Sequence, residues 1–121
     1  MNFIFNILLL FFLSLLNEGQ STLYGKYCSN IFGNKLDISI LNNTANISID
    51  LFGKQINCNK ELFNLSNNKL LFSNNQSDCL NINLKKFGAC PCPPNIIYDN
   101  KSNSLEILDT PMGTLFLKNC N

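Results

Sequence analysis

Apolar and polar residues alternate along two neighbouring segments of the chain, residues 36–41 and 45–52. A period of two places the apolar side chains on one face of a β-strand and the polar ones on the other. Residues 42–44, Asn-Asn-Thr, lie between the two segments, and asparagine tolerates the left-handed backbone angles of a tight turn. The pattern predicts a β-hairpin, followed by a short strand that begins after Gly53 and ends at Cys58.

Further strands are predicted by short apolar segments bounded by turn-forming residues. Residues 69–73 lie between two asparagine pairs and predict one strand. Residues 95–98, 104–108 and 114–118 predict a three-stranded meander near the C-terminus. Residues 89–94 contain three prolines, which fix φ and remove backbone donors, so this segment predicts a stiff, extended connector.

One segment has the period of a helix, with Leu80, Leu84 and Phe87 at positions i, i+4 and i+7. Ser77 or Asp78 can begin it, and a lysine pair in its last turn complements the helix dipole, which predicts an amphipathic helix of about three turns. These elements together predict a β-rich α+β fold. We expect a small antiparallel sheet or sandwich of about six or seven strands, with the helix packed on it and disulfides stapling it.

The N-terminus has the pattern of a targeting signal. Residues 3–16 are almost wholly apolar and uncharged, yet too short to cross a bilayer comfortably as a mature helix. Small residues, Gly19 and Ser21, stand at −3 and −1 for cleavage after Ser21, which predicts a signal peptide over 1–21 and one domain over 22–121. Because no lysine or arginine precedes the apolar run, a signal-anchor or a core helix remains the alternative. The signal peptide implies a secreted or extracellular protein, or one retained in endomembrane compartments, without a mature transmembrane segment.

All six cysteines follow the leader: Cys28, Cys58, Cys79, Cys90, Cys92 and Cys120. An even number in a short exported chain predicts a disulfide framework. Two intervals, 28 to 58 and 90 to 120, both span 30 residues. This spacing fits an internal duplication with the pairs Cys28–Cys58 and Cys90–Cys120, but any small meander with cysteines at its ends gives it too. The third pair would then be Cys79–Cys92. A direct Cys90–Cys92 bond is disfavoured because it would close a small, strained ring.

Five asparagines stand in the Asn-x-Ser/Thr pattern of N-glycosylation: Asn42, Asn46, Asn64, Asn75 and Asn100. Several fall where turns are predicted, and a glycan needs such an exposed position. Asparagine is so abundant in this chain that chance also produces such patterns. The candidates support export without deciding it.

Composition excludes several kinds of chemistry. The chain has no histidine, which removes the commonest general base and metal ligand, and no Ser-His-Asp or Cys-His site can exist. Its formal net charge is +1 and every basic residue is a lysine, so neither a strong field nor an arginine fork recruits nucleic acid. The carboxylates fall on the polar faces of predicted strands or at caps and turns. We therefore expect no enzyme, no metal and no cofactor.

Two functions remain. The first is a small secreted, non-catalytic binding or surface-interaction protein of unknown partner, acting through loops and strand edges. The alternative is a secreted carrier of a lipid or other apolar ligand, which requires an enclosed apolar cavity of several hundred Å³. Phe52 and Phe116 are relevant to both functions, because the alternation of their strands does not place either residue on the inward face.

Overall fold

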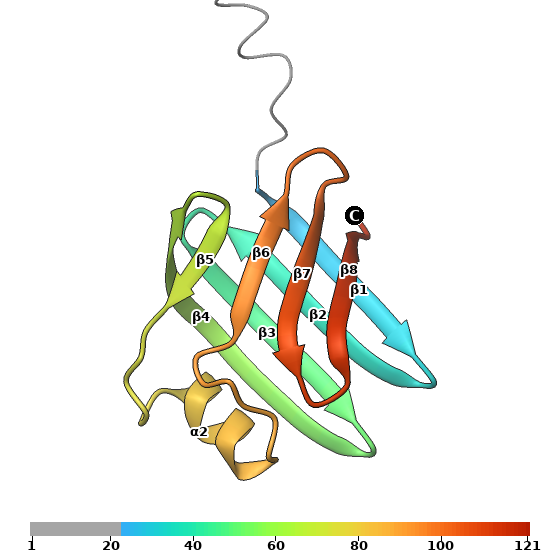
Figure 1. Cartoon of the computed structure of the whole chain (residues 1–121), viewed down its shortest axis with the longest axis vertical. Helices are drawn as coiled ribbons and strands as arrows, with labels where there is room; N and C mark the ends of the chain where they lie inside the picture. The colour runs from blue at the N-terminus through green and yellow to red at the C-terminus, as the bar shows by residue number, and fades with distance from the viewer. Residues whose placement is uncertain (1–22) are drawn as a thin grey trace, which may run out of the picture.

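The computed structural model describes residues 23–121, which form a closed barrel of eight antiparallel strands in chain order. Each strand pairs with its neighbours in the chain, and β8 pairs with β1 (Figure 1). The elements are β1 (Gly25–Ile31), β2 (Asn34–Leu41), β3 (Thr44–Leu51), β4 (Lys54–Ser66), β5 (Lys69–Phe72), α2 (Cys79–Lys86), β6 (Asn95–Asp99), β7 (Ser104–Thr110) and β8 (Gly113–Asn119). The signal peptide predicted for residues 1–21 lies outside the described residues.

The predicted hairpin is confirmed as β2 and β3. Leu36 pairs with Ile49 and Ile38 with Ile47, and all four side chains are buried. The intervening polar residues face outward, so the period of two in the sequence corresponds to the inner and outer faces of the barrel wall.

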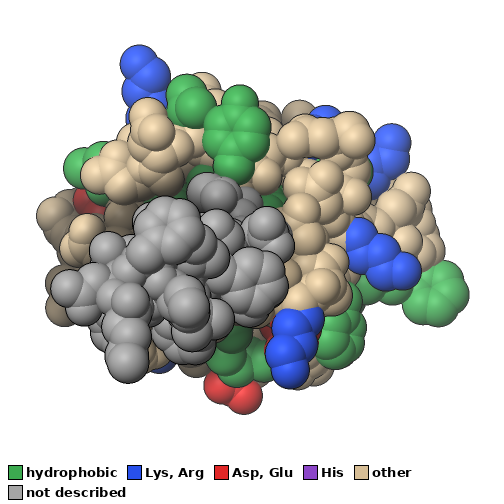
Figure 2. All heavy atoms as spheres, turned by 90° about the horizontal axis from the view of Figure 1, so that it is seen from above, with side chains coloured by type: hydrophobic (Ala, Val, Ile, Leu, Met, Phe, Trp, Pro, Cys, Tyr) green, Lys and Arg blue, Asp and Glu red, His purple; other side chains and the backbone are tan. Residues whose placement is uncertain are grey.

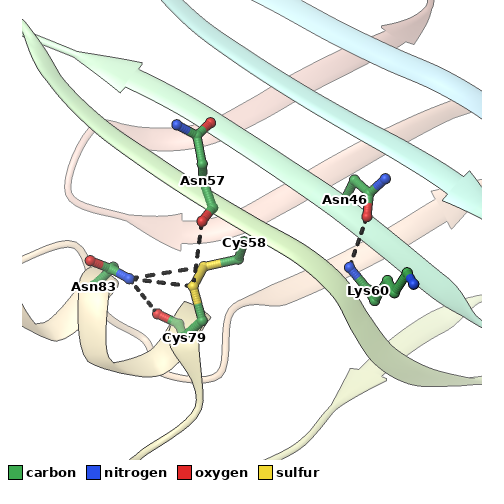
Figure 3. Close-up of a disulfide and its surroundings, with 6 residues drawn as sticks. All are labelled: Asn46, Asn57, Cys58, Lys60, Cys79 and Asn83. Carbon is green, nitrogen blue, oxygen red and sulfur yellow. Dashed lines mark hydrogen bonds between the residues drawn. A yellow bond between two sulfur atoms is a disulfide. The ribbon is translucent and has the colours of Figure 1, made fainter.

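β4 continues to Ser66, eight residues beyond the end predicted at Cys58. A bulge interrupts its pairing with β3, since Ala45 pairs with Glu61 whereas Ile47 pairs with Cys58. The Asn46 side-chain oxygen accepts a hydrogen bond from the Lys60 backbone N–H at 2.8 Å (Figure 3). The extra residue of a bulge breaks the alternation along a strand, which is why the pattern at this point reads as a strand end.

The predicted meander is confirmed as β6, β7 and β8, and the predicted strand at 69–73 as β5. The predicted helix is α2, which has only eight residues because Phe87 already forms its C-cap. Asp78 is the N-cap, and Lys85 and Lys86 lie in the last turn. Among residues 23–121, no helix has the length and hydropathy that crossing a membrane requires.

The prediction of six or seven strands in a sheet or sandwich is wrong, because an eighth strand, β1, closes the sheet into a barrel. Tyr27 is its one buried residue, so the segment lacks the alternation that predicts a strand. β1 meets β8 through two residue pairs, Tyr27 with Asn119 and Cys28 with Lys118. The Cys120 N–H also donates to the Lys26 carbonyl at 2.8 Å. We call this junction the seam.

All three predicted disulfide pairs are wrong. The bonds are Cys28–Cys120, Cys58–Cys79 and Cys90–Cys92. The first follows from closure, which brings the first and last strands together although they are 92 residues apart. The second joins β4 to the start of α2, and the third joins two residues of the connector, which is bent rather than extended.

One end of the barrel interior is filled by aromatic side chains and an asparagine. The rings of Tyr27 and Tyr98 meet edge to face, with centroids 6.4 Å apart. Both hydroxyls donate to the side-chain oxygen of Asn103, at 2.7 and 3.0 Å. Burial raises the pKa of the Tyr27 hydroxyl, so it stays a neutral donor. Leu105 and Leu117, both fully buried, complete this solid half of the core.

Candidate ligand-binding cavity

The other half of the barrel contains an apolar cavity of about 240 Å³. Its walls come from the barrel strands, from α2 and from the connector between α2 and β6. The lining residues are Leu36, Ile38, Ile47, Ile49, Leu51, Phe52, Lys54, Ile56, Leu80, Leu84, Phe87, Gly88, Ala89, Pro91, Pro94, Ile96, Ile107, Leu108, Thr110, Pro111, Met112 and Leu115. Of these, Lys54 and Thr110 alone have polar side chains. Such a lining favours apolar ligands.

The cavity lies where the barrel interior changes from aromatic to aliphatic residues. Leu36, Ile49 and Leu115 project inward from three strands and are nearly buried, but they do not reach across the barrel as Tyr27 and Tyr98 do at the other end. An eight-stranded barrel is just wide enough for side chains to fill it or for one small ligand to occupy it. This barrel combines both arrangements, one in each half.

α2 lies at one end of the barrel, beside β4 (Figure 1). Leu80 and Leu84 project from it into the core and also line the cavity. Asn81, between them, is buried and donates from its amide to the Ser73 and Asn75 carbonyls, at 2.9 and 2.8 Å. These bonds tie the loop before the helix to α2 and pair the amide nitrogen, whereas the side-chain oxygen of Asn81 is buried without a hydrogen-bond partner among the described residues.

A disulfide fixes the start of α2 to the barrel wall. Cys58 on β4 is bonded to Cys79, the first residue of the helix (Figure 3). The Asn83 amide lies beside this bond, donates to the Cys79 carbonyl at 2.7 Å and lies 3.5 Å from the Cys79 sulfur. The helix is therefore held covalently at one end and by packing along its length.

Glu61 lies close to the same disulfide. Burial raises the pKa of its carboxyl, a backbone hydrogen bond from Leu80 opposes the rise, and the charge of Asp78 adds to it. Its oxygen and the sulfurs of Cys58 and Cys79 lie within 4.8 Å of one another, the one cluster of metal-ligand type among residues 23–121. Because thiolates are the sulfur ligands of metals, the bonded sulfurs give this cluster no metal-binding role in the oxidised protein.

The cavity is bordered by cations. The Lys54 amine stands 5.6 Å from the centre of the Phe87 ring, and the Lys86 amine stands 6.0 Å from it. Both distances allow cation–π attraction, which holds the two lysines at the aromatic border of the cavity. The site can therefore hold an apolar body beside an anionic group.

The candidate glycosylation sites lie elsewhere, and none lines this cavity. Four are exposed, namely Asn42, Asn46, Asn64 and Asn75, whereas Asn100 is half-buried in the turn between β6 and β7. Asn46 and Asn75 have side-chain oxygens that already accept backbone hydrogen bonds. Use of these sites stays a prediction.

Among residues 23–121, no carboxylate lines the cavity. Asp37, Asp50 and Glu106 are half-buried on the strands, and none of them lines it. Asp99 accepts a hydrogen bond from the Lys101 backbone at 3.0 Å, and this bond lowers the pKa of its carboxyl. These are the positions on strands and in turns that the sequence indicated.

Sequence reasoning found Phe52 and Phe116 as outward residues, and they are 81% and 58% exposed. It did not find the cavity, because inward aliphatic residues that fill a core and those that border a space have the same pattern.

Comparison with known proteins gives no match: no family model fits the chain, and no curated protein or solved structure is significantly similar to it. The three disulfides are compatible with an extracellular protein.

Proposed function

We propose that this protein is a small, secreted, non-catalytic carrier of a single-chain apolar ligand, which it holds inside the barrel. The observation that carries the proposal is the apolar cavity of about 240 Å³ beneath α2. The carrier function considered from the sequence requires an enclosed apolar cavity of several hundred Å³; this cavity is smaller and partly open, so it supports only a carrier of a small ligand. The absence of histidine from the chain supports a role without catalysis.

The volume limits the class of ligand. A dry apolar cavity of about 150 Å³ already binds benzene, and pockets for drug-sized ligands run from about 300 to 1,000 Å³. A cavity of about 240 Å³ falls between the two. It suits one hydrocarbon chain or a small ring system, and it is too small for both chains of a phospholipid.

The border of the cavity favours a ligand with an acidic head. Lys54 and Lys86 bring two amines to the same edge of an otherwise apolar space. A carboxylate or phosphate there would pair with them, while the chain stays in the barrel. Both lysines are exposed, so each pair would contribute about 1 kcal/mol or less, and burial of the chain supplies most of the affinity.

Chain length provides a quantitative test. If each carbon occupies about the 30 Å³ of a water molecule, about eight carbons fill the 240 Å³. Burial stabilises a complex by about 0.8 kcal/mol per methylene, so each added carbon should lower Kd about fourfold. This gain should stop once the chain is longer than about eight to ten carbons. A series of alkanoates measured by calorimetry would show this break.

Two variants of β3 separate the interior from the wall. Ile49→Trp places an indole in the cavity, because Ile49 lines it, and should raise the Kd of the best alkanoate about tenfold by displacing about two methylenes. Ser48→Trp is the matched control, since its side chain is exposed on the outer face. Equal affinity for both variants would contradict binding inside the barrel.

Native mass spectrometry of protein purified from its host provides an independent test. A co-purifying mass that is lost on denaturation supports the carrier. A clean mass of the protein alone, together with no alkanoate binding, would refute it.

The second candidate function is interaction through the surface, and closure of the barrel changes its form. Every strand in residues 23–121 has a neighbour on both sides, so the strand edges expected from the sequence offer no binding site. The turns remain, and two of them expose phenylalanine.

A further inference from the structure

The turns at the two ends of the barrel have opposite chemistry. Alternate turns of an up-and-down barrel lie at the same end, as Figure 1 shows. At the end opposite the cavity the tips are asparagines, Asn42-Asn43 and Asn67-Asn68. At the cavity end they are Phe32-Gly33, Phe52-Gly53 and Pro111-Met112. Of these hairpin turns, those with apolar tips therefore all lie at the cavity end.

The two phenylalanines lie in water at positions that do not suit them. Phe32 is 100% exposed and Phe52 is 81% exposed, and both have a φ of 52°. Each is followed by a glycine that also has a positive φ, which defines a type I′ turn, where asparagine is preferred and a bulky side chain is disfavoured. The fold does not require phenylalanine there, since Asn67-Asn68 forms a turn with the same signs of φ.

The two tips are held next to each other. Asn34, the buried first residue of β2, accepts a hydrogen bond from the Phe52 backbone N–H through its side-chain oxygen at 2.9 Å. The hairpin that has Phe32 at its tip therefore fixes the backbone of the second tip. The pair forms one rigid apolar projection rather than two independent loops.

Positive charge surrounds this projection. Four exposed lysines belong to the cavity end: Lys35, Lys54, Lys85 and Lys86. Two carboxylates, Asp50 and Asp109, lie near them on β3 and β7, which leaves a positive excess. The view from above (Figure 2) looks onto the opposite end of the barrel, where lysines stand singly around the outline. The excess of lysines at the cavity end therefore favours an anionic partner, and the exposed phenylalanines indicate that this end of the barrel contacts it.

We propose that the cavity end is a docking surface for a lipid bilayer that contains anionic lipids, with Phe32 and Phe52 inserted among the headgroups and the surrounding lysines paired with phosphates. Apolar side chains flanked by lysines are how peripheral proteins bind such interfaces. The same end opens onto the candidate cavity, which Phe52 lines. Docking would therefore bring the cavity to the source of a single-chain lipid. This surface extends the proposed function, and the two can fail separately.

Flotation with vesicles tests the docking surface. The protein is produced from its full coding sequence in a secreting eukaryotic host, and its N-terminus is read by mass spectrometry, because an uncleaved leader would itself bind membranes. Vesicles are phosphatidylcholine alone or phosphatidylcholine mixed with phosphatidylserine. We expect binding to the mixed vesicles, much weaker binding to the neutral ones, and loss of binding as salt is raised.

The test variant is Phe32→Asn/Phe52→Asn, which places the residue that these turns prefer at both tips. We expect vesicle partitioning to fall about tenfold or more, with a thermal midpoint equal to or above that of the wild type. Misfolding cannot produce that combination. Phe116→Thr is the matched control, because it removes an exposed phenylalanine from the wall of β8 and should bind as the wild type does.

Three results would overturn the docking surface. They are equal partitioning of the double variant and the wild type, equal binding to neutral and mixed vesicles, and Phe-dependent dimers in sedimentation velocity without vesicle binding. Phe32→Asn alone does not alter the cavity lining, so its alkanoate affinity reports on the carrier separately. Normal alkanoate binding with no vesicle binding would refute docking and leave the carrier intact.

Discussion

Removing the disulfide between Cys28 and Cys120 tests how the barrel closes. The seam has two residue pairs between β1 and β8, the Cys120–Lys26 backbone hydrogen bond and this disulfide. The Lys26 N–H also donates to the side-chain oxygen of Asn121 at 3.1 Å. The double variant Cys28→Ala/Cys120→Ala removes the covalent link and leaves the pairing strands unchanged.

The size of the effect follows from the separation of the two cysteines, which is 92 residues. In the chain-entropy description, a loop of that length restricts the unfolded chain by about 4–5 kcal/mol. A domain of this size has about 5–15 kcal/mol in total, so the variant should lose a large share of its stability. The Cys90–Cys92 link spans 2 residues, and its removal should cost only about 1–2 kcal/mol by the same reasoning.

Urea unfolding followed by circular dichroism measures both values, with Cys90→Ala/Cys92→Ala as the control variant. We expect the seam variant to unfold at much lower urea than the control. If the two variants lost equal stability, or the control lost more, loop closure would not be the main contribution of the seam disulfide, and our account of the junction would be wrong.

Two further predictions concern burial. Glu61 has a pKa raised by burial, so the folded state holds its proton more tightly than the unfolded state, and its ionisation costs stability above the folded pKa. That cost disappears as the pH falls through the folded pKa to below the unfolded pKa. Glu61→Gln should therefore be more stable than the wild type at neutral pH, and parallel urea titrations should show the difference in stability shrinking on acidification. A difference that stays constant with pH would contradict this. Leu105 is fully buried in the half of the core away from the cavity. Leu105→Ala should lower the free energy of unfolding by about 2–5 kcal/mol and leave the alkanoate affinity measured by calorimetry unchanged. A loss of affinity without a loss of stability would show that the two halves are not separate.

The sequence predicted the local parts of the fold well. The hairpin of β2 and β3 and the meander of β6 to β8 depend on neighbouring segments, so alternation and turn residues specify them directly. Closure depends on contacts between the ends of the chain, and β1 has little alternation because only Tyr27 is buried. The disulfides follow closure, and equal spacing along the sequence therefore misled the pairing of Cys28 and Cys120.

The candidate site was predicted less well than the fold. Leu36 and Leu115 appear in the sequence as ordinary inward residues, and only their arrangement around a shared space distinguishes them from core. Lys54 appears as a turn residue, and its place beside Phe87 depends on where α2 packs. Phe52 was the useful exception, because its mismatch with the strand face was visible from the pattern and it lies at the border of the cavity.

The hydrogen-bonded cluster of Tyr27, Tyr98 and Asn103 has a kinetic consequence. These side chains fill the barrel interior away from the cavity, so a ligand held in the cavity would enter and leave at the α2 end. The ligand would then bind and dissociate through the same opening, which is bordered by α2 and the turn at Phe52. A surface that covers this opening would slow binding and dissociation together. The residence time of the ligand would therefore depend on the residues that border this opening.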